Sequence, residues 1–268
     1  MKIHQLRIDF NVTEEIKRFV YVYIIESSCL YLIDSGVYGS ESIIIPYIES
    51  IGRKKEEIRG IFLTHAHPDH IGTAAYFREK CGCKVYASYG EKPWIEDIDL
   101  QFKERPIPGF YNLAGKSSAV DTTVEDGDIL QPEKELTLRV VGTPGHSADE
   151  VSYIIDDNMF IGDTVPVKGE IPIYINKEKT MNSLNILDNT EGVNTFYPAW
   201  DKTYTKKELS EKTEEARHLI RQIDSSLSKT GKNSSLDILV DAVCSDLDMP
   251  FLKSNPLFIR TVSSHIKS

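Results

Sequence analysis

The residues with the clearest chemical potential lie between positions 64 and 70, which read Thr-His-Ala-His-Pro-Asp-His. His65 and His67 are two residues apart, so on an extended backbone they point to the same side and can bind one cation. Asp69 and His70 follow a proline at which a strand must end, and they can serve a second cation beside the first. Imidazole and carboxylate ligands suit zinc, iron or manganese better than calcium or magnesium. The segment therefore predicts a transition-metal site.

Two later segments add further metal-binding candidates. The run from Gly142 to Ser147 follows a predicted strand and contains His146, and Gly162 precedes Asp163 directly after another predicted strand. Glycine at these positions lets the backbone turn sharply and come close to a bound ion. Either segment by itself is also compatible with an ordinary β-turn. In chain order with residues 64–70, they favour one metal centre built from several strand ends.

The elements around these segments follow from the hydrophobic pattern. The short apolar run at 60–63 predicts the strand that carries the first motif, and a helix over 72–80 and a strand over 84–87 follow it. A hairpin at 19–33 precedes a helix over 40–51. Further strands are expected over the segments 137–141, 151–155 and 158–161.

Two other regions differ from this alternating pattern. Residues 88–120 contain three prolines, three glycines and scattered aromatics without a period, which predicts a lid or binding wall, or a short surface helix. From about residue 206 the apolar spacing becomes helical, and it resumes over 235–247 and 256–266. We therefore expect a main domain over 1–205 and a helical extension over 206–268 packed on it. This extension can cap the site or form a homodimer interface, and its sequence does not decide between the two.

Composition excludes several classes of protein. The chain has 268 residues, is 40% hydrophobic and carries a formal charge of −10, which disfavours binding to nucleic acid through phosphate neutralisation. No apolar run resembles a signal peptide or a membrane span, so we expect a soluble, cytoplasmic protein without a membrane partner. The four cysteines fit neither a zinc ribbon nor a disulfide framework, and reduced thiols are expected. A redox role for Cys81-Gly82-Cys83 is the less favoured alternative.

Taken together, the motifs over about residues 18–201 resemble those of the metallo-β-lactamase superfamily, which has a His-x-His-x-Asp-His motif, a later His and a later bridging Asp. The resemblance implies an α/β fold, a four-layer αββα sandwich with the metal site at one edge between two sheets. It also implies that His65, His67 and His146 form a first metal site, that Asp69 and His70 belong to a second, and that Asp163 bridges both. Asp34 resembles a structural aspartate of the family rather than a ligand.

One position departs from the family pattern. The family closes the second site with another histidine after the last core strand, and Trp200 stands at the matching position. Because indole has no free lone pair for a metal, the second site keeps Asp69, His70 and Asp163 only. Asp201 is a less favoured replacement donor. His218 and His265 lie in the helical extension, where surface positions are the favoured interpretation.

The predicted function is hydrolysis by a metal-bound hydroxide, with zinc as one or two ions and iron or manganese as alternatives. Asp69 is the catalytic candidate, because it can orient the water or carry its proton to the leaving group. The resemblance implies a glyoxalase II-like or lactonase-like enzyme that acts on a thioester or lactone of a small molecule. A mononuclear iron dioxygenase-like enzyme and a catalytically poor ligand-binding or signalling protein are the alternatives. The aromatic candidates for a substrate wall are Trp94, Phe110, Tyr111, Tyr174 and Trp200.

Overall fold

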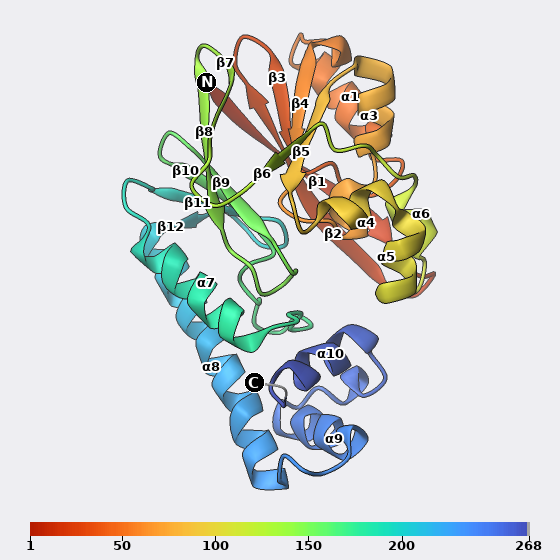
Figure 1. Cartoon of the computed structure of the whole chain (residues 1–268), viewed down its shortest axis with the longest axis vertical. Coiled ribbons are helices and arrows are strands. Elements are labelled where there is room, and N and C mark those ends of the chain that lie inside the picture. Colours follow the sequence, from red (N-terminus) through yellow and green to blue (C-terminus); the bar gives the residue numbers. More distant parts are fainter. Residues whose placement is uncertain (267–268) are drawn as a thin grey trace.

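The computed structural model describes residues 1–266, which form two mixed sheets packed face to face (Figure 1). The first sheet has the order β1 (Lys2–Asn11), β2 (Lys17–Glu26), β3 (Leu30–Ile33), β4 (Ile58–Phe62), β5 (Lys84–Ser88), β6 (Thr122–Val124). The second has the order β12 (Tyr204–Thr205), β11 (Thr195–Pro198), β10 (Asn158–Gly162), β9 (Val151–Ile155), β8 (Leu136–Gly142), β7 (Ile129–Glu133). Strands β3 to β6 are parallel, so their carboxyl ends meet at one edge of the sheet.

Strand β2 shows how the sequence builds the layers. Val20, Val22 and Ile24 are buried in the core on the helix-covered face of the first sheet, whereas Tyr23 and Ile25 are buried between the two sheets. Successive side chains of a strand point to opposite faces of its sheet. Because the side chains on both faces of β2 are apolar, both faces must be covered. The first sheet is therefore an inner layer.

Helices supply the two outer layers. The first sheet is covered by α1 (Glu41–Ser50), α2 (Pro68–Ile71), α3 (Ala74–Cys81), α4 (Lys92–Glu96), α5 (Ile98–Glu104) and α6 (Phe110–Ala114). The second is covered by α7 (Lys177–Asn189) and α8 (Lys206–Thr230), which α9 (Leu236–Asp246) and α10 (Pro256–Ser264) extend. Single 3₁₀ turns lie at η1 (Lys55–Glu57) and η2 (Pro250–Leu252). The predicted four-layer sandwich is confirmed.

Helix α8 begins where the sequence pattern changes. The Thr205 side chain accepts the backbone N–H of Glu208, and the Glu208 carboxylate accepts the N–H of Thr205, a reciprocal cap that starts the helix. Its apolar face, including Ile220 and Ile223, is buried in the same core as Phe196 of the second sheet. The expected helical extension is thus present, and its first helix is part of the sandwich. A domain boundary at 205/206 stays a prediction.

Some elements were not predicted from the pattern. Strands β1, β6, β7 and β12 and helix α7 lie outside the predicted set, and residues 88–120 hold helices α4, α5 and α6 where a lid, wall or short helix was expected. Cys83 is a buried free thiol whose pKa burial raises to about 12, so it is poorly suited to redox chemistry. Within residues 1–266, no helix combines the length and the apolar character needed to cross a bilayer.

Candidate metal centre

Strand β4 delivers the first motif to the edge of the sandwich. The strand ends at Phe62, and His65 and His67 follow in the connection to α2. His67 is the residue before the helix, with an extended backbone, and Pro68 occupies the first helical turn, where its missing N–H costs nothing. Asp69 and His70 therefore lie on this short helix, whereas the sequence predicted a helix that begins only near residue 72.

The first group of donors comes from three separate segments. Nδ1 of His67 lies 2.9 Å from Nε2 of His65 and 2.8 Å from Nε2 of His146. Oδ2 of Asp163 lies 3.3 Å from Nε2 of His146 and 3.9 Å from Nε2 of His65. All four ligand atoms lie within 4.8 Å of one another, a spacing that suits a single tetrahedral cation.

A second group shares Asp163 with the first. Nε2 of His70 lies 3.4 Å from Oδ1 of Asp163 and 3.6 Å from Oδ2 of Asp69. Asp163 thus directs one carboxylate oxygen to each group. The structure brings together all six residues predicted from the sequence, in the two sets that the family resemblance implies.

Hydrogen bonds on the far side of the rings determine which nitrogen can bind a metal. Nδ1 of His146 lies 2.8 Å from the carbonyl oxygen of Ile173, and Nδ1 of His70 lies 2.8 Å from Oδ2 of Asp34. Both oxygens act as acceptors, so each Nδ1 must carry the hydrogen. Nε2 of each ring, when neutral, then presents its lone pair to the donor group.

His65 is oriented in the same way by Thr64. The Thr64 hydroxyl donates to the carboxylate of Asp34, at 2.9 Å from Oδ2, so it can accept the Nδ1 hydrogen of His65 at 3.0 Å. Asp34 is buried and makes these contacts from a left-handed backbone with φ 58°. It is therefore a structural residue that orients two candidate ligands, as expected.

Two buried atoms of the second group lack hydrogen bonds. Nε2 of His70 and Oδ1 of Asp163 make none with any of residues 1–266, although they face each other at 3.4 Å. A buried polar atom without a partner costs about 1–3 kcal/mol. A cation between these atoms would satisfy both. The residues present thus fit a metal, and their N and O donors suit zinc, iron or manganese.

The electrostatic state of the histidines differs between the two groups. Burial lowers the pKa of His65 and His67 well below the ordinary value and that of His146 to about 4, which keeps these rings neutral and ready to bind. Burial also opposes the charged form of His70, but the carboxylates of Asp163, Asp34 and Asp69 outweigh it and raise its pKa. Without a metal, His70 therefore carries a proton at neutral pH.

The two carboxylates of the second group respond differently to burial. Burial raises the pKa of Asp69. It acts in the same direction on Asp163, but there His70 and His146 prevail and lower the pKa. The two histidines thus favour the anionic form of Asp163, whose charge balances that of His70.

Two buried glutamates that the sequence did not reveal connect the ligand segments. Glu91 accepts the backbone N–H of Ala66 at 3.0 Å and that of Asp149 at 2.9 Å, which ties the first motif to the loop of His146. Glu150 accepts the N–H of Asp163 at 2.9 Å and lies 3.8 Å from Nδ1 of His65. Burial raises the pKa of both glutamates. In the sequence, these glutamates could have been recognised only by their positions, Glu91 shortly after β5 and Glu150 just before β9.

Comparison with known protein families shows which family the chain belongs to. The family model described as the metallo-beta-lactamase superfamily matches residues 16–197, which include all six clustered residues. The chain belongs to this superfamily.

Curated relatives add distant homology to one branch of the superfamily. A hydroxyacylglutathione hydrolase of Rhodopseudomonas palustris (strain BisB5) is 31% identical over 142 residues, which is 50% of this chain and 47% of the relative. One from Nitrobacter hamburgensis is 33% identical over 122 residues, which is 45% of this chain and 39% of the relative. The chain thus matches less than half the length of these relatives.

Solved structures show that the fold likeness extends into the C-terminal helices. A metallo-beta-lactamase family protein from Thermus thermophilus has a TM-score of 0.74 at 16% identity, covering 98% of this chain and 91% of its own. A beta-lactamase domain protein from Burkholderia ambifaria has a TM-score of 0.71 at 15% identity, covering 98% and 84%. At these identities the likeness concerns the fold.

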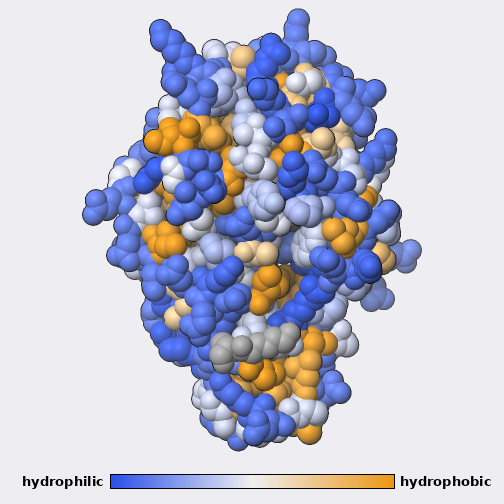
Figure 2. Space-filling model, viewed as in Figure 1, coloured by the Kyte–Doolittle hydropathy of each residue, from blue (hydrophilic) through white to orange (hydrophobic). Residues whose placement is uncertain are grey.

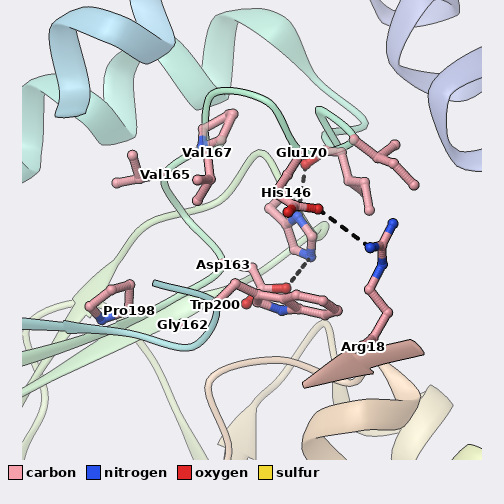
Figure 3. Close-up of a pocket in the computed structure, with 12 residues that line it drawn as sticks. Arg18, His146, Gly162, Asp163, Val165, Val167, Glu170, Pro198 and Trp200 are labelled. Carbon is pink, nitrogen blue, oxygen red and sulfur yellow. Dashed lines mark hydrogen bonds and ion pairs between the residues drawn. The ribbon is translucent and has the colours of Figure 1, made fainter. Parts of the chain in front are cut away.

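Trp200 is the residue that the family resemblance matches to a histidine. Its indole lies beside Asp163 in the site (Figure 3), and its buried Nε1 makes no hydrogen bond within the described chain. Asp201 does not replace the missing donor, because it accepts the hydroxyl of Tyr204 at 2.7 Å and lies 3.8 Å from Lys212. That alternative was wrong.

The other two histidines considered from the sequence lie away from the site. His218 lies beside a shallow depression along α8. His265 is buried, with Nδ1 2.8 Å from Asp224 and Nε2 2.6 Å from the hydroxyl of Tyr174. The surface interpretation holds for His218, which is exposed, and was wrong for His265.

The donor groups open into a cavity of ≈ 350 Å³ between the main body and the C-terminal helices. His67, Asp69, His146 and Asp163 line one end of it. Most of the remaining wall is apolar, and its larger members are Phe10, Ile107, Leu113, Ile171, Trp200 and Phe251. Figure 2 shows apolar side chains at the surface where the C-terminal helices meet the body.

Of the five aromatic residues considered for a substrate wall, Trp200 lines this cavity. Phe110 and Tyr174 are buried in the core, and Tyr111 is exposed. Trp94 donates to Glu104 at 2.7 Å and has its ring centre 6.5 Å from that of His67, behind the cavity wall. The sequence thus identified one of the aromatic wall residues and missed Phe10 and Phe251.

Helix α10 braces a candidate ligand from a distance. The Thr261 hydroxyl donates to the carbonyl of Pro172 at 2.8 Å and accepts the N–H of Tyr174 at 3.1 Å. These contacts flank Ile173, whose carbonyl orients His146. The C-terminal extension therefore both lines the cavity and fixes the backbone that sets the tautomer of His146.

Proposed function

We propose that this protein is a metal-dependent hydrolase that cleaves an ester-like bond, a thioester or a lactone, in a small molecule. The observation that carries the proposal is the pair of donor groups that share Asp163 and face a largely apolar cavity of ≈ 350 Å³. Sites for small molecules are commonly concave and apolar with a few convergent polar groups. The distant relatives named hydroxyacylglutathione hydrolase support an ester-like substrate.

In this proposal His65, His67, His146 and Asp163 hold one zinc ion, and Asp69, His70 and Asp163 hold a second. Zinc bound here would lower the pKa of water to about 7 and polarise the substrate carbonyl. Hydrolysis adds the water oxygen to the carbonyl carbon and breaks the C–S or C–O bond, and the leaving thiol or alcohol takes up a proton. Asp69 lines the cavity and is placed to orient the water and transfer that proton.

The rest of the chain contributes geometry and exclusion of water. Glu91, Glu150 and Asp34 fix the ligand loops through the hydrogen bonds described above, so the donors are held in position before an ion arrives. Trp200 and the apolar residues around it surround the reacting bond with few groups that bind water. Such a dry wall strengthens the electrostatic interactions at the site.

The test compares zinc-loaded with chelator-treated protein on a panel of thioesters and lactones. We expect turnover of at least one of these classes with zinc, and its loss by at least 100-fold on chelation and in Asp163→Asn. Asp157→Asn changes an acid in the turn between β9 and β10 and should retain activity. Binding of panel compounds without turnover by the zinc-loaded protein would contradict the hydrolase and favour a ligand-binding role.

A mononuclear iron enzyme is a second candidate, which Trp200 favours. The second group has three donors, whereas the first has three histidines and one carboxylate that suffice for a single ion. Iron bound as a single ion, with uptake of oxygen in the presence of a substrate thiol, would support this candidate. Zinc as the metal that copurifies with the chain would contradict it.

A further inference from the structure

The cavity contains a buried positive charge that no residue in the described part of the chain neutralises by direct contact. Arg105 is 4% exposed and lines the cavity beside His67 and Asp69. Its buried Nη1 makes no hydrogen bond, and no ion pair within 4.0 Å is formed with any of residues 1–266. Burial lowers the pKa of Arg105 to about 10, so the guanidinium is still charged at neutral pH. An unpaired buried charge is costly and rare unless it has a function.

The fold holds this arginine firmly against the metal centre. Arg105 ends helix α5, and its N–H donates to the carbonyl of Gln101 at 2.7 Å. The Gln101 side chain donates to the carbonyl of Ala66, between the two histidines of the first motif, at 2.6 Å. On the other side, Arg260 of α10 donates to the carbonyl of Glu104. Its position is therefore fixed by both the metal loop and the C-terminal helices.

Nearby carboxylates are already committed to other partners. Asp69 and Asp163 belong to the proposed donor groups, where bound cations would neutralise them. The oxygens of Glu91 accept hydrogen bonds from Ala66, Ser147 and Asp149. With the metal site filled, none of these three acids is free to pair directly with Arg105.

The second guanidinium of the cavity is in a different state. Arg18 of β2 lies 3.6 Å from the carboxylate of Glu170, and the pair spans the cavity wall near His146 (Figure 3). Its side chain is 30% exposed, so water also compensates its charge. Among residues 1–266, the cavity therefore offers one unpaired cation in an apolar surround, which suits a ligand with one negative charge.

We propose that Arg105 binds a carboxylate of the substrate, so that the natural substrate is a small carboxylated thioester or lactone with an apolar body. The nature of the bond that is cleaved rests on the function proposed above, whereas the anion site rests on Arg105 itself. Guanidinium pairs with carboxylate through two parallel hydrogen bonds, which also orients the substrate. A phosphate dianion would bring more charge than one arginine balances.

The test measures the preference of the zinc-loaded protein for a carboxylate over its neutral amide. Isothermal titration calorimetry at low ionic strength compares hexanoate with hexanamide on the native chain and on Arg105→Met, Arg105→Lys and Arg78→Met, in which the altered arginine pairs with Asp121 outside the cavity lining. We expect hexanoate to bind at least tenfold more tightly than hexanamide to the native chain. Arg105→Met should reduce this ratio at least fivefold, Arg105→Lys should retain part of it, and Arg78→Met should leave it unchanged.

Zinc itself attracts carboxylates, and the variants separate its effect from that of Arg105. If Arg105→Met keeps the native ratio of hexanoate to hexanamide affinity, the preference comes from the metal and the proposal is overturned. Equal binding of the two probes to the native chain would also overturn it. If Arg105→Met does not fold, a reduced ratio in a folded, zinc-loaded Arg105→Lys would support bidentate recognition by Arg105, and an unchanged ratio would overturn it. A retained ratio without turnover of any thioester or lactone would overturn only the hydrolase.

Discussion

Asp34 holds Nδ1 of His70 at 2.8 Å, and the opposite nitrogen of the same ring faces Asp163 at 3.4 Å. A residue of the first sheet thus aims a candidate ligand at the second donor group. Because Asp34 also accepts the N–H and hydroxyl of Thr64, one carboxylate orients both His70 and the loop of His65. The orientation of the candidate ligands therefore depends on Asp34, which is not itself a candidate ligand.

Asp34→Asn should weaken binding of the second metal ion by about 10–100-fold, which is the usual effect of losing a residue that hydrogen-bonds to a metal ligand. Asparagine tolerates the left-handed backbone of Asp34, so the change tests the hydrogen bonds rather than strain. Asp156→Asn is the matched control, because Asp156 has φ 53° in an exposed turn. Zinc titration monitored by calorimetry measures both. Equal second-site affinity in the two variants would contradict the role of Asp34.

Trp200→His should raise the affinity of the second group for zinc by at least tenfold, because it supplies the neutral donor that indole lacks. Trp200→Phe removes the indole without adding a donor and should cause no such rise. Elemental analysis by plasma mass spectrometry gives the metal-to-chain ratio of each protein. Two ions per native chain, with no gain in the variant, would show that tryptophan is tolerated at this position.

Binding of the second ion should release a proton. The pKa of His70 is raised well above its ordinary value in the metal-free chain, so at neutral pH the ion must displace the proton from Nε2. Affinity should therefore increase about tenfold per pH unit as the pH rises, and level off above the pKa of His70. Calorimetry in two buffers with different ionisation enthalpies counts the released protons. If binding of the second ion at pH 6.5 releases no proton, the positive charge assigned to His70 in the metal-free chain is wrong.

Arg105→Met should stabilise the zinc-loaded fold while it impairs binding of carboxylates. The lowering of the pKa of Arg105 to about 10 corresponds to a penalty of about 3 kcal/mol on the charged form, which is present in full at all pH values below about 10. Replacing an unpaired buried charge by an apolar side chain removes this penalty. We expect Tm to rise by a few degrees. Arg78→Met removes a partner of Asp121 on the surface and should not raise it.

Thr261→Val should weaken zinc binding by the first group several-fold, although Thr261 lies outside the cavity lining. Valine has nearly the same shape but cannot hold the carbonyl of Pro172 and the N–H of Tyr174 that flank Ile173. Ser263→Ala on the same helix removes only a bond to the carbonyl of Ile259 and serves as control. Zinc titration with a fluorescent competitor measures both variants. Equal zinc affinities of Thr261→Val and Ser263→Ala would contradict the proposed connection between α10 and His146.

The predicted ligands could be found from the sequence because each stands directly after an apolar strand. His65, His146 and Asp163 follow β4, β8 and β10, and strand ends on one edge of a sandwich must converge. The two-sheet arrangement that makes these edges adjacent came from the family resemblance, since hydrophobic alternation by itself does not specify which strands are neighbours.

The residues that the sequence did not reveal belong to the surroundings of the ligands. Glu91, Glu150 and Arg105 are single charged residues without a motif, and their burial became visible only with the fold. Arg105 in particular lies in the segment 88–120, whose prolines and glycines obscured helices α4 to α6. Asp201 was considered because it is adjacent to Trp200, but the turn before β12 directs its side chain to Tyr204.

The contact between Thr261 and the backbone around Ile173 has a consequence for the order in which the site forms during synthesis. The family match ends at residue 197, whereas the helix that orients His146 spans Pro256–Ser264. A nascent chain that has exposed every candidate ligand to solvent still lacks this helix. We expect high-affinity capture of the metal to wait until helix α10 has left the ribosome.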